Sequence, residues 1–503
     1  MQSQPVGTMQ QPTAGTTNHQ MRALLAMVGV ALLLNYVETM ILPGILDIQN
    51  YFSTSVSAVS WITSAFLIVG SAVSPLFGKL GDSYGKKKMF LIALVFYTAG
   101  VGAAGFSPSI YFLIAARAVQ GVGFAIVPLA LAIIAETFPK ERIATAQGIV
   151  SATFAIGAAA GLVLGAYIVQ DLGWQWAFHS AFILSVMLFV VIWRFLPQGH
   201  TGTGKKVDYE TVILLMVGVS LMLFYLSEGP YEGWYSAYGL ASLAAGVALT
   251  VGFFVAEARK SNPLIHLSLL KIRNVLVANG IGIISGIGMF MLFYAVVFLA
   301  EDPAPLGFGL DPIAAGLTLG PAAIAMLVAG PAIGRLVTRY GPKPTMALGG
   351  LIAIAGFVLF IFNRGSTTDL AIATAVSMIG SISLIIPIVN MISVSLPRDT
   401  VATGLGLNTM LRNIGGAIGP VVATTIMSTY TTVVNIPHQT SQGVIRVPVP
   451  FPNATAFDYV FYFGAAVMFA AIVLSFATKN YVFRKQASTG DRPVGEEAGH
   501  SSG

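Results

Sequence analysis

The chain reads PLFGKLGDSYG at residues 75–85 and PAIGRLVTRYG at residues 331–341, an offset of 331 − 75 = 256 residues. It also reads PKERIATAQG at residues 139–148 and PRDTVATGLG at residues 397–406, an offset of 397 − 139 = 258 residues. Because both pairs keep their order at nearly one offset, the sequence predicts an internal duplication.

A shared glycine spacing continues each copy beyond its second block. The positions are Gly148, Gly157 and Gly161 in the first copy, and Gly406, Gly415 and Gly419, followed by Pro420, in the second. Small residues at four-residue spacing allow membrane helices to approach closely. We therefore predict that these glycines are helix-packing positions. In a membrane protein, duplicated halves indicate a transporter with its site between the repeats.

The composition is that of a membrane protein. Of 503 residues, 55% are hydrophobic and only 9% are charged, whereas a soluble domain carries about 25% charged residues. The apolar stretches are long and continuous, which excludes an outer-membrane barrel. The chain has no cysteine, which excludes disulfides, thiol catalysis and thiolate metal sites. Its six histidines are scattered, so we expect no metal site, no cofactor and no enzyme activity.

Hydropathy predicts fourteen membrane helices of about 20 residues each, with helix 1 at residues 22–46 and helix 4 at residues 110–135. The repeats pair helix 2 with helix 10 and helix 5 with helix 13, so the copies lie parallel. We predict an all-α fold with two parallel six-helix repeats and two inserted helices. The predicted regions are an N-terminal tail at 1–21, a six-helix bundle at 22–196, a linker with the inserted helices at 197–257, a second bundle at 258–480 and a tail at 481–503.

Basic residues predict the orientation of the bundle. Of 26 Lys and Arg residues, Arg117 and Arg412 fall inside predicted spans, and Arg364 and Arg446 in loops that follow odd-numbered helices. The remaining 26 − 4 = 22 lie on one side, which the positive-inside rule makes cytoplasmic. We therefore expect a multi-pass protein of the cell membrane with both termini cytoplasmic. This distribution explains the basic balance without nucleic-acid binding.

Glu38 is the one carboxylate well inside an apolar span, and such residues usually mark ion or proton paths. Arg117 lies at a similar depth, about 10 Å from the same side at 1.5 Å per residue. We predict that Glu38 and Arg117 form the proton-coupling site, in which arginine favours the ionised carboxylate and burial favours the neutral one. A static structural pair is the alternative.

Arg412 falls near the middle of predicted helix 13, where a lone cation can receive an anion or a carbonyl-rich compound. A generic gating or structural role is the alternative. We assign Arg412 to the substrate cavity together with four neutral amides that can supply polar contacts: Asn35, Gln120, Asn408 and Asn413. Membrane helices also use such amides to join one another.

These motifs resemble the major facilitator superfamily over essentially the whole chain. Residues 78–88, GKLGDSYGKKK, look like its signature loop between helices 2 and 3, and residues 113–123 look like its helix-4 motif. The glycine spacing of helix 5 is similar to the motif associated with antiporters, although Leu162 stands where that motif has proline. Fourteen helices are typical of the drug:proton antiporter branch.

The resemblance implies a latch that stabilises one of two alternating conformations, formed by Gly78, Asp82, Gly85 and Lys86. It also implies a small-molecule substrate, proton exchange, and a monomer in the lipid bilayer. We therefore expect a proton-coupled exporter of lipophilic or cationic compounds. The alternatives are an exchanger or importer of a small organic anion or other metabolite, and a membrane receptor or scaffold. In the long loop at residues 429–457, residues 444–448 are expected to be extended.

Overall fold

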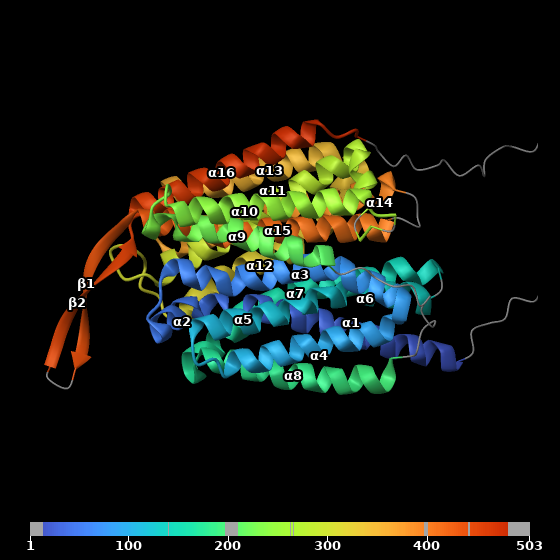
Figure 1. The fold of residues 1–503 in the computed structure, drawn as a ribbon, viewed down its shortest axis with the longest axis horizontal. Helices are drawn as coiled ribbons and strands as arrows, with labels where there is room; N and C mark the ends of the chain where they lie inside the picture. The colour runs from blue at the N-terminus through green and yellow to red at the C-terminus, as the bar shows by residue number, and fades with distance from the viewer. Residues whose placement is uncertain are drawn as a thin grey trace, which may run out of the picture.

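The computed structural model of the chain is a bundle of long helices that lie side by side (Figure 1). It describes the backbone of residues 14–138, 140–196, 210–261, 263–264, 266–396, 401–440 and 443–480. Within these ranges the surroundings of several residues are not described, among them those of Asp82 and Gly148. Residues 197–209 of the predicted linker region at 197–257, and the predicted tail at 481–503, lie outside the described residues.

The first group of helices forms the lower part of Figure 1. It consists of α1 (Ala14–Thr39), η1 (Leu42–Gly44), α2 (Ile45–Phe52), α3 (Val56–Tyr84), α4 (Lys86–Gly105), α5 (Ile110–Gln120), η2 (Gly121–Ala125), α6 (Ile126–Thr137), α7 (Lys140–Leu172) and α8 (Trp174–Phe195). Helix α1 begins at Ala14, so the predicted tail at 1–21 already contains helical residues.

Two predicted helices of this group are interrupted. The helix predicted at 22–46 ends at Thr39 and continues as η1 and α2, because Pro43 lacks the N–H that a continuing α-helix needs. The helix predicted at 110–135 is split into α5 and α6 by the 3₁₀ segment η2. A Cβ on Gly121, within η2, would lie 2.4 Å from the carbonyl oxygen of Phe66 on α3, so close packing against α3 requires glycine there.

The second group follows the inserted pair along the chain. The inserted pair is α9 (Glu210–Glu232) and α10 (Ala237–Arg259). The second group consists of η3 (Leu267–Lys271), α11 (Arg273–Glu301), α12 (Pro312–Tyr340), α13 (Pro342–Phe362), α14 (Thr367–Ser395), α15 (Val401–Thr429) and α16 (Ala454–Phe476). Between α15 and α16, β1 (Thr431–Thr440) pairs antiparallel with β2 (Gly443–Pro452). Residues 444–448 therefore lie in a strand, as predicted.

Helix caps repeat between the two groups as the sequence blocks do. Ser55 caps α3 by accepting a hydrogen bond from the Ala58 N–H, and Asp311 caps α12 in the same way. At the other ends of these helices, Gly85 has φ +97° and Gly341 has φ +89°. Residues with a Cβ atom rarely adopt such backbone angles. The sharp turn into the next helix therefore requires the glycine at the end of each signature block.

Twelve of the described helical segments are long and apolar enough to span a membrane. Helices α7 and α15, with 33 and 29 residues, are two further helices of spanning length. These two helices carry the glycine spacing of the repeats, and α15 also carries Asn408, Arg412 and Asn413. The fold is therefore the predicted all-helical bundle with a small β-hairpin at one end.

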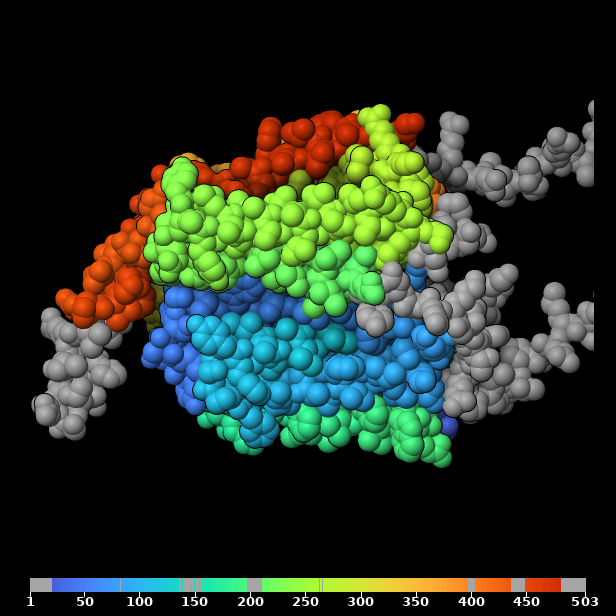
Figure 2. Space-filling model, viewed as in Figure 1, coloured from blue at the N-terminus to red at the C-terminus, as the bar shows by residue number. Residues whose placement is uncertain are grey.

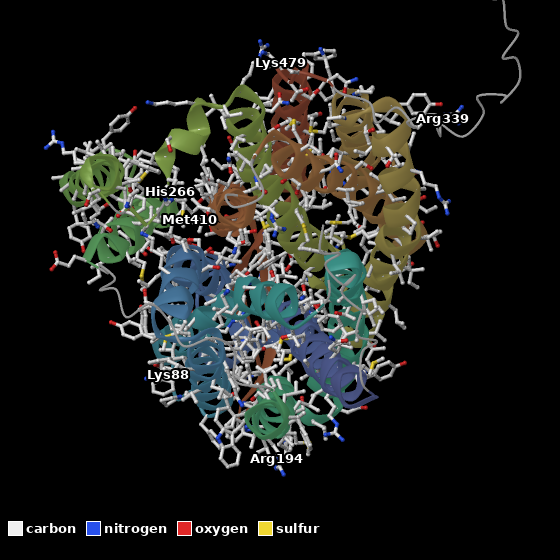
Figure 3. The ribbon with its side chains drawn as sticks, turned by 90° about the vertical axis from the view of Figure 1, so that its right-hand side faces the viewer. Lys88, Arg194, His266, Arg339, Met410 and Lys479 are labelled. Atoms are coloured by element: carbon white, nitrogen blue, oxygen red, sulfur yellow. The ribbon has the colours of Figure 1, made fainter. Side chains whose placement is uncertain are left out.

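The two ends of the bundle differ in character. We call the end that carries β1 and β2, at the left of Figure 1, the hairpin end. We call the other end the basic end. Figure 3 views the molecule from the basic end and shows Lys88, Arg194, Arg339 and Lys479 around its rim.

The inserted pair lies along the line where the two groups meet, and in Figure 2 it covers one side of the bundle. Near the hairpin end, the Ser57 and Ser227 hydroxyls of α3 and α9 are 2.6 Å apart, and Thr425 of α15 donates to the Leu226 carbonyl at 2.9 Å. Helix α9 is thus bonded to both groups. Near the basic end, Lys79 donates to the Pro263 carbonyl.

Candidate functional site

Glu38 lies on the last turn of α1, where α1 packs against α7. The Thr39 hydroxyl donates to the Ala158 carbonyl of α7 at 2.9 Å. A Cβ on Gly161 would lie 2.4 Å from the Tyr36 carbonyl oxygen, and one on Gly157 would lie 2.5 Å from the Leu32 carbonyl oxygen. The two glycines therefore allow backbone contact between α1 and α7, which positions the turn that carries Glu38.

The second repeat holds Arg412 in a corresponding way. A Cβ on Gly415 would lie 2.1 Å from the Ile283 carbonyl oxygen of α11, and one on Gly419 would lie 2.5 Å from that of Ile287. Conversely, a Cβ on Gly286 of α11 would lie 2.1 Å from the Arg412 carbonyl oxygen. Helix α11 therefore contacts the backbone of Arg412 directly, and the glycines position this arginine.

The other predicted packing residues differ among themselves. A Cβ on Gly406 would meet no atom within 4 Å, so in this conformation Gly406 makes no close helix approach. Pro420 lies inside α15, and its carbonyl accepts a hydrogen bond from Thr424 at 2.9 Å. The surroundings of Gly148 lie outside the described residues.

The charges of two arginines, one from each group of helices, act on Glu38. The positive charges that act on it are those of Arg412 on α15 and, more weakly, of Arg117 on α5. Among the described side chains none forms an ion pair with Glu38 within 4 Å. The sequence paired Glu38 with Arg117, whereas the structure gives the stronger interaction to Arg412.

Arg117 is fully buried between α3 and α5. Its Nε donates to the Ile62 carbonyl at 3.2 Å, and its Nη1 donates to Gln120 Oε1 at 2.9 Å. Its guanidinium carbon lies 4.3 Å from the centre of the Phe66 ring, a cation–π arrangement. These contacts join α5 to α3. Its charge still reaches Glu38.

Arg412 has a different environment. Its side chain is partly exposed, and the described residues provide it with no hydrogen-bond acceptor and no ion pair. The carboxylate whose charge acts on it is that of Glu38. Within the part of the chain that the structure describes, Arg412 is therefore the partly exposed intramembrane arginine whose hydrogen-bonding capacity is left open for a ligand, whereas the unpartnered Nη2 of Arg117 is buried.

The four predicted amides do not share one environment. Gln120 is fully buried and belongs to the Arg117 contacts. Asn408 is buried and donates to the Ala278 carbonyl of α11 at 3.1 Å, so it joins α15 to α11. Asn35 is partly exposed and donates to the Ala31 carbonyl of its own helix at 2.9 Å. Asn413 is buried, and its Nδ2 has no partner among the described groups. Gln120 and Asn408 therefore lie in helix contacts rather than beside a ligand in this conformation.

Sequence reasoning missed a hydroxyl contact between the two groups of helices. The Tyr294 hydroxyl of α11 donates to Thr63 Oγ1 of α3 at 2.9 Å, and both side chains are buried. The charge of Arg117 also acts on Tyr294. A tyrosine in an apolar helix resembles any other core aromatic residue in sequence, so no local pattern identifies it.

The predicted latch lies at the basic end, where α3 turns into α4. Asp82 is in the last turns of α3, but its side chain lies outside the described residues. Gly85 makes the turn with its positive φ, and Lys86 begins α4. A Cβ on Gly78 would meet no atom within 4 Å, so steric crowding in this conformation does not explain that glycine.

Comparison with known sequences places the chain among transporters. It matches the Major Facilitator Superfamily over residues 27–420 and 278–498. It is 27% identical to Multidrug transporter protein MdtP of Bacillus subtilis (strain 168), over 74% of this chain and 69% of that protein. It is also 27% identical to Multidrug resistance protein Stp of Mycobacterium tuberculosis (strain ATCC 25618 / H37Rv), over 83% and 78% of the two chains.

Solved structures share the fold. The human organic anion transporter MFSD10 (TETRAN) matches with a TM-score of 0.60 at 18% identity, and the match covers 92% of this chain and 100% of that chain. The nucleoside transporter NupG matches with a TM-score of 0.59 at 14% identity, covering 92% and 98%. At such low sequence identities, the structural matches show a shared fold and nothing about function. The sequence match, however, extends over most of the chain, and the chain therefore belongs to the Major Facilitator Superfamily, as a fourteen-helix secondary transporter.

Proposed function

We propose that the chain is a proton-coupled exporter of lipophilic or cationic compounds that works by alternating access. The observation that carries this proposal is that the charge of Arg412 on the second repeat and, more weakly, that of Arg117 on the first repeat act on Glu38 of the first repeat. A carboxyl group in this position changes the charge balance between the repeats when it gains or loses a proton. Relatives named as multidrug transporters support the substrate class.

The charge balance explains how a proton and a cationic compound compete. With Glu38 ionised, its charge is set against two arginines, leaving a surplus of one positive charge. With Glu38 protonated, both arginine charges are uncompensated and a cation is strongly disfavoured, because charges interact strongly where water is excluded. A cationic compound therefore binds after the proton leaves and dissociates as the proton returns.

The contacts between the two groups support a conformation that is closed at the hairpin end. A Cβ on Gly316 of α12 would lie 2.8 Å from the Leu162 carbonyl oxygen of α7, and Gln170 of α7 accepts a hydrogen bond from the Ile313 N–H at 3.1 Å. These residues lie toward the hairpin end of their helices. With the basic end in the cytoplasm, as the positive-inside rule proposes, this conformation is inward-facing.

The test is transport by the purified chain in proteoliposomes with an imposed pH gradient. The panel contains lipophilic cations, organic anions and neutral compounds. We expect cations to accumulate against their gradient when the opposite side is acidic, and Glu38→Gln to abolish this accumulation while downhill exchange continues. Accumulation by Glu38→Gln with an unchanged pH dependence would refute coupling through Glu38. Absence of any transport would favour a receptor or scaffold.

A second candidate is exchange or import of an organic anion. The observation in its favour is the partly exposed Arg412, whose guanidinium has no acceptor among the described residues. If the substrate is an anion, Arg412→Ala removes a charge-assisted contact of about 1.5–3 kcal/mol, roughly a ten- to hundredfold loss of affinity. If the substrate is a cation, Arg412→Ala leaves affinity unchanged or raises it.

Binding measurements on Arg412→Ala across the panel separate the two candidates, and Arg412→Lys is the control for charge without the planar guanidinium. Loss of binding for every transported compound in the folded alanine variant would refute the cation exporter. Unchanged or tighter cation binding would refute the anion transporter.

A further inference from the structure

A second group of buried carboxyls lies at the hairpin end, away from Glu38. Asp302 directly follows α11 and is 1% exposed. Its Oδ2 has no hydrogen-bond partner, and the neighbouring Glu301 Oε1 is also without one in the described part of the chain. A buried polar atom without a partner is costly and requires an explanation.

The chain encloses Asp302 by folding back over the end of α11. Three backbone hydrogen bonds hold the returning loop: Phe308 N–H to the Leu299 carbonyl, Gly309 N–H to the Asp302 carbonyl, and Leu310 N–H to the Ala300 carbonyl, at 2.8–3.0 Å. A Cβ on Gly307 would lie 2.8 Å from Asp302 Cβ. The loop therefore covers the Asp302 carboxyl with backbone that donates nothing to it.

The charged groups around this site all carry the same sign. The charges that act on Glu301 are those of Asp47 on α2, Asp302 beside it, and Asp311 at the start of α12. No basic side chain of the described chain is among them. Asp311 uses one oxygen to cap α12. Like charges held together out of water disfavour simultaneous ionisation.

The site lies on the boundary between the two groups of helices. Asp47 belongs to the first group, whereas Glu301, Asp302 and Asp311 belong to the second. The end of α11 contacts η1 and α2, close to where α7 meets α12. Closing the hairpin end therefore brings carboxyls of one group toward carboxyls of the other, and opening it separates them.

We propose that Asp302 and Glu301, with Asp47 opposite, form a proton-binding gate that takes up protons as the hairpin end of the bundle closes. The site is separate from the Glu38 site and does not depend on which compound is transported. Protons bound here remove the repulsion between the groups and stabilise the closed hairpin end. Their loss favours opening.

The pH range follows from Asp302. Burial raises the pKa of its carboxyl to about 8. Because the closed state holds the proton more tightly, its extra stability is present below the ordinary pKa of an aspartic acid and is lost as pH rises through about 8. A site facing the exterior of a cell with an acidic exterior would be protonated, which favours the inward-facing state.

The test measures the width of the hairpin end without substrate. Because the chain has no cysteine, spin labels at Tyr111→Cys on α5 and Thr368→Cys on α14, both exposed positions, report the distance between the groups. We expect the unaltered gate to change from a short to a long distance between about pH 6 and 9. Asp302→Asn should keep the short distance over the whole range.

Two further variants guard against misfolding and general charge effects. Asp47→Asn, at a half-buried position on α2, should weaken the opening at high pH, because the charge of the first group that acts on Glu301 is gone. Asp171→Asn, an exposed carboxylate at the end of α7, should leave the midpoint unchanged. A distance independent of pH, or Asp302→Asn and Asp47→Asn that follow the parent, would overturn the proposal.

The same measurement in a Glu38→Gln background separates this proposal from the proposed function. We expect the pH response to persist there. A response that disappears with Glu38→Gln and survives Asp302→Asn would assign the titration to Glu38 and overturn the gate, while leaving proton-coupled transport intact.

Discussion

Substituting Gly415 tests whether the repeat glycines hold the site helices in place. A Cβ at this position would lie 2.1 Å from the Ile283 carbonyl oxygen, whereas the usual closest approach of carbon and carbonyl oxygen is about 3.3 Å. Helices α11 and α15 must therefore separate by about 1 Å at this level. Overpacking of this kind costs about 1–3 kcal/mol, and the gain of a better helix former returns about 0.5–1 kcal/mol.

We therefore expect Gly415→Ala to lower the free energy of unfolding by up to about 2.5 kcal/mol, measured by reversible unfolding in mixed micelles. The matched control is Gly406→Ala, the same change on the same helix, where a Cβ meets no atom within 4 Å. The control should be neutral or more stable. Equal stabilities for the two variants would refute the inference that Gly415 sets the approach of α11 to α15.

Two other substitutions probe the balance between conformations. Asp82→Asn should slow turnover and shift the populations of the two states with little change in substrate affinity, because a latch acts only through contacts that differ between states. The accessibility of single cysteines placed at both ends of the bundle measures this shift. Lost affinity with unchanged accessibility would place Asp82 in the binding site. Tyr294→Phe removes the hydrogen bond to Thr63 and should lower the stability of the conformation described here by about 0.5–1.5 kcal/mol. Thr63→Val should have the same effect, and the double variant should lose no more stability than either single variant. Additive effects would mean that the two hydroxyls act separately.

The fold could be predicted because its signals are long. Apolar stretches of about 20 residues mark spans wherever they occur, and the repeated blocks fix the relation of the two halves. The breaks in the first and fourth spans were missed, although Pro43 was visible. Hydropathy is averaged over a window of residues, so it does not detect a helix break caused by the missing N–H of a single proline. The tight turns at Gly85 and Gly341 repeat because the signature blocks repeat.

For the candidate site, the sequence could show which polar and charged residues lie within the helices, but not which of them interact. Counting residues from a helix end gives depth but not the direction in which a side chain points, so the depth match of Glu38 and Arg117 could not show that the charge of Arg412 also acts on Glu38. Gln120 follows Arg117 by three residues, and that helical spacing was the available signal that the amide binds the arginine. The pairing of Tyr294 with Thr63 spans 231 residues and leaves no mark in either segment.

The central claim is that a proton on Glu38 and a bound cationic substrate exclude each other. The most direct measurement is proton release when a saturating transported cation is added to the purified chain in weakly buffered detergent solution. Near the pH at which Glu38 titrates, the account predicts release of up to about one proton per chain, and none from Glu38→Gln that still binds the cation. Equal release from the variant and the parent would contradict it.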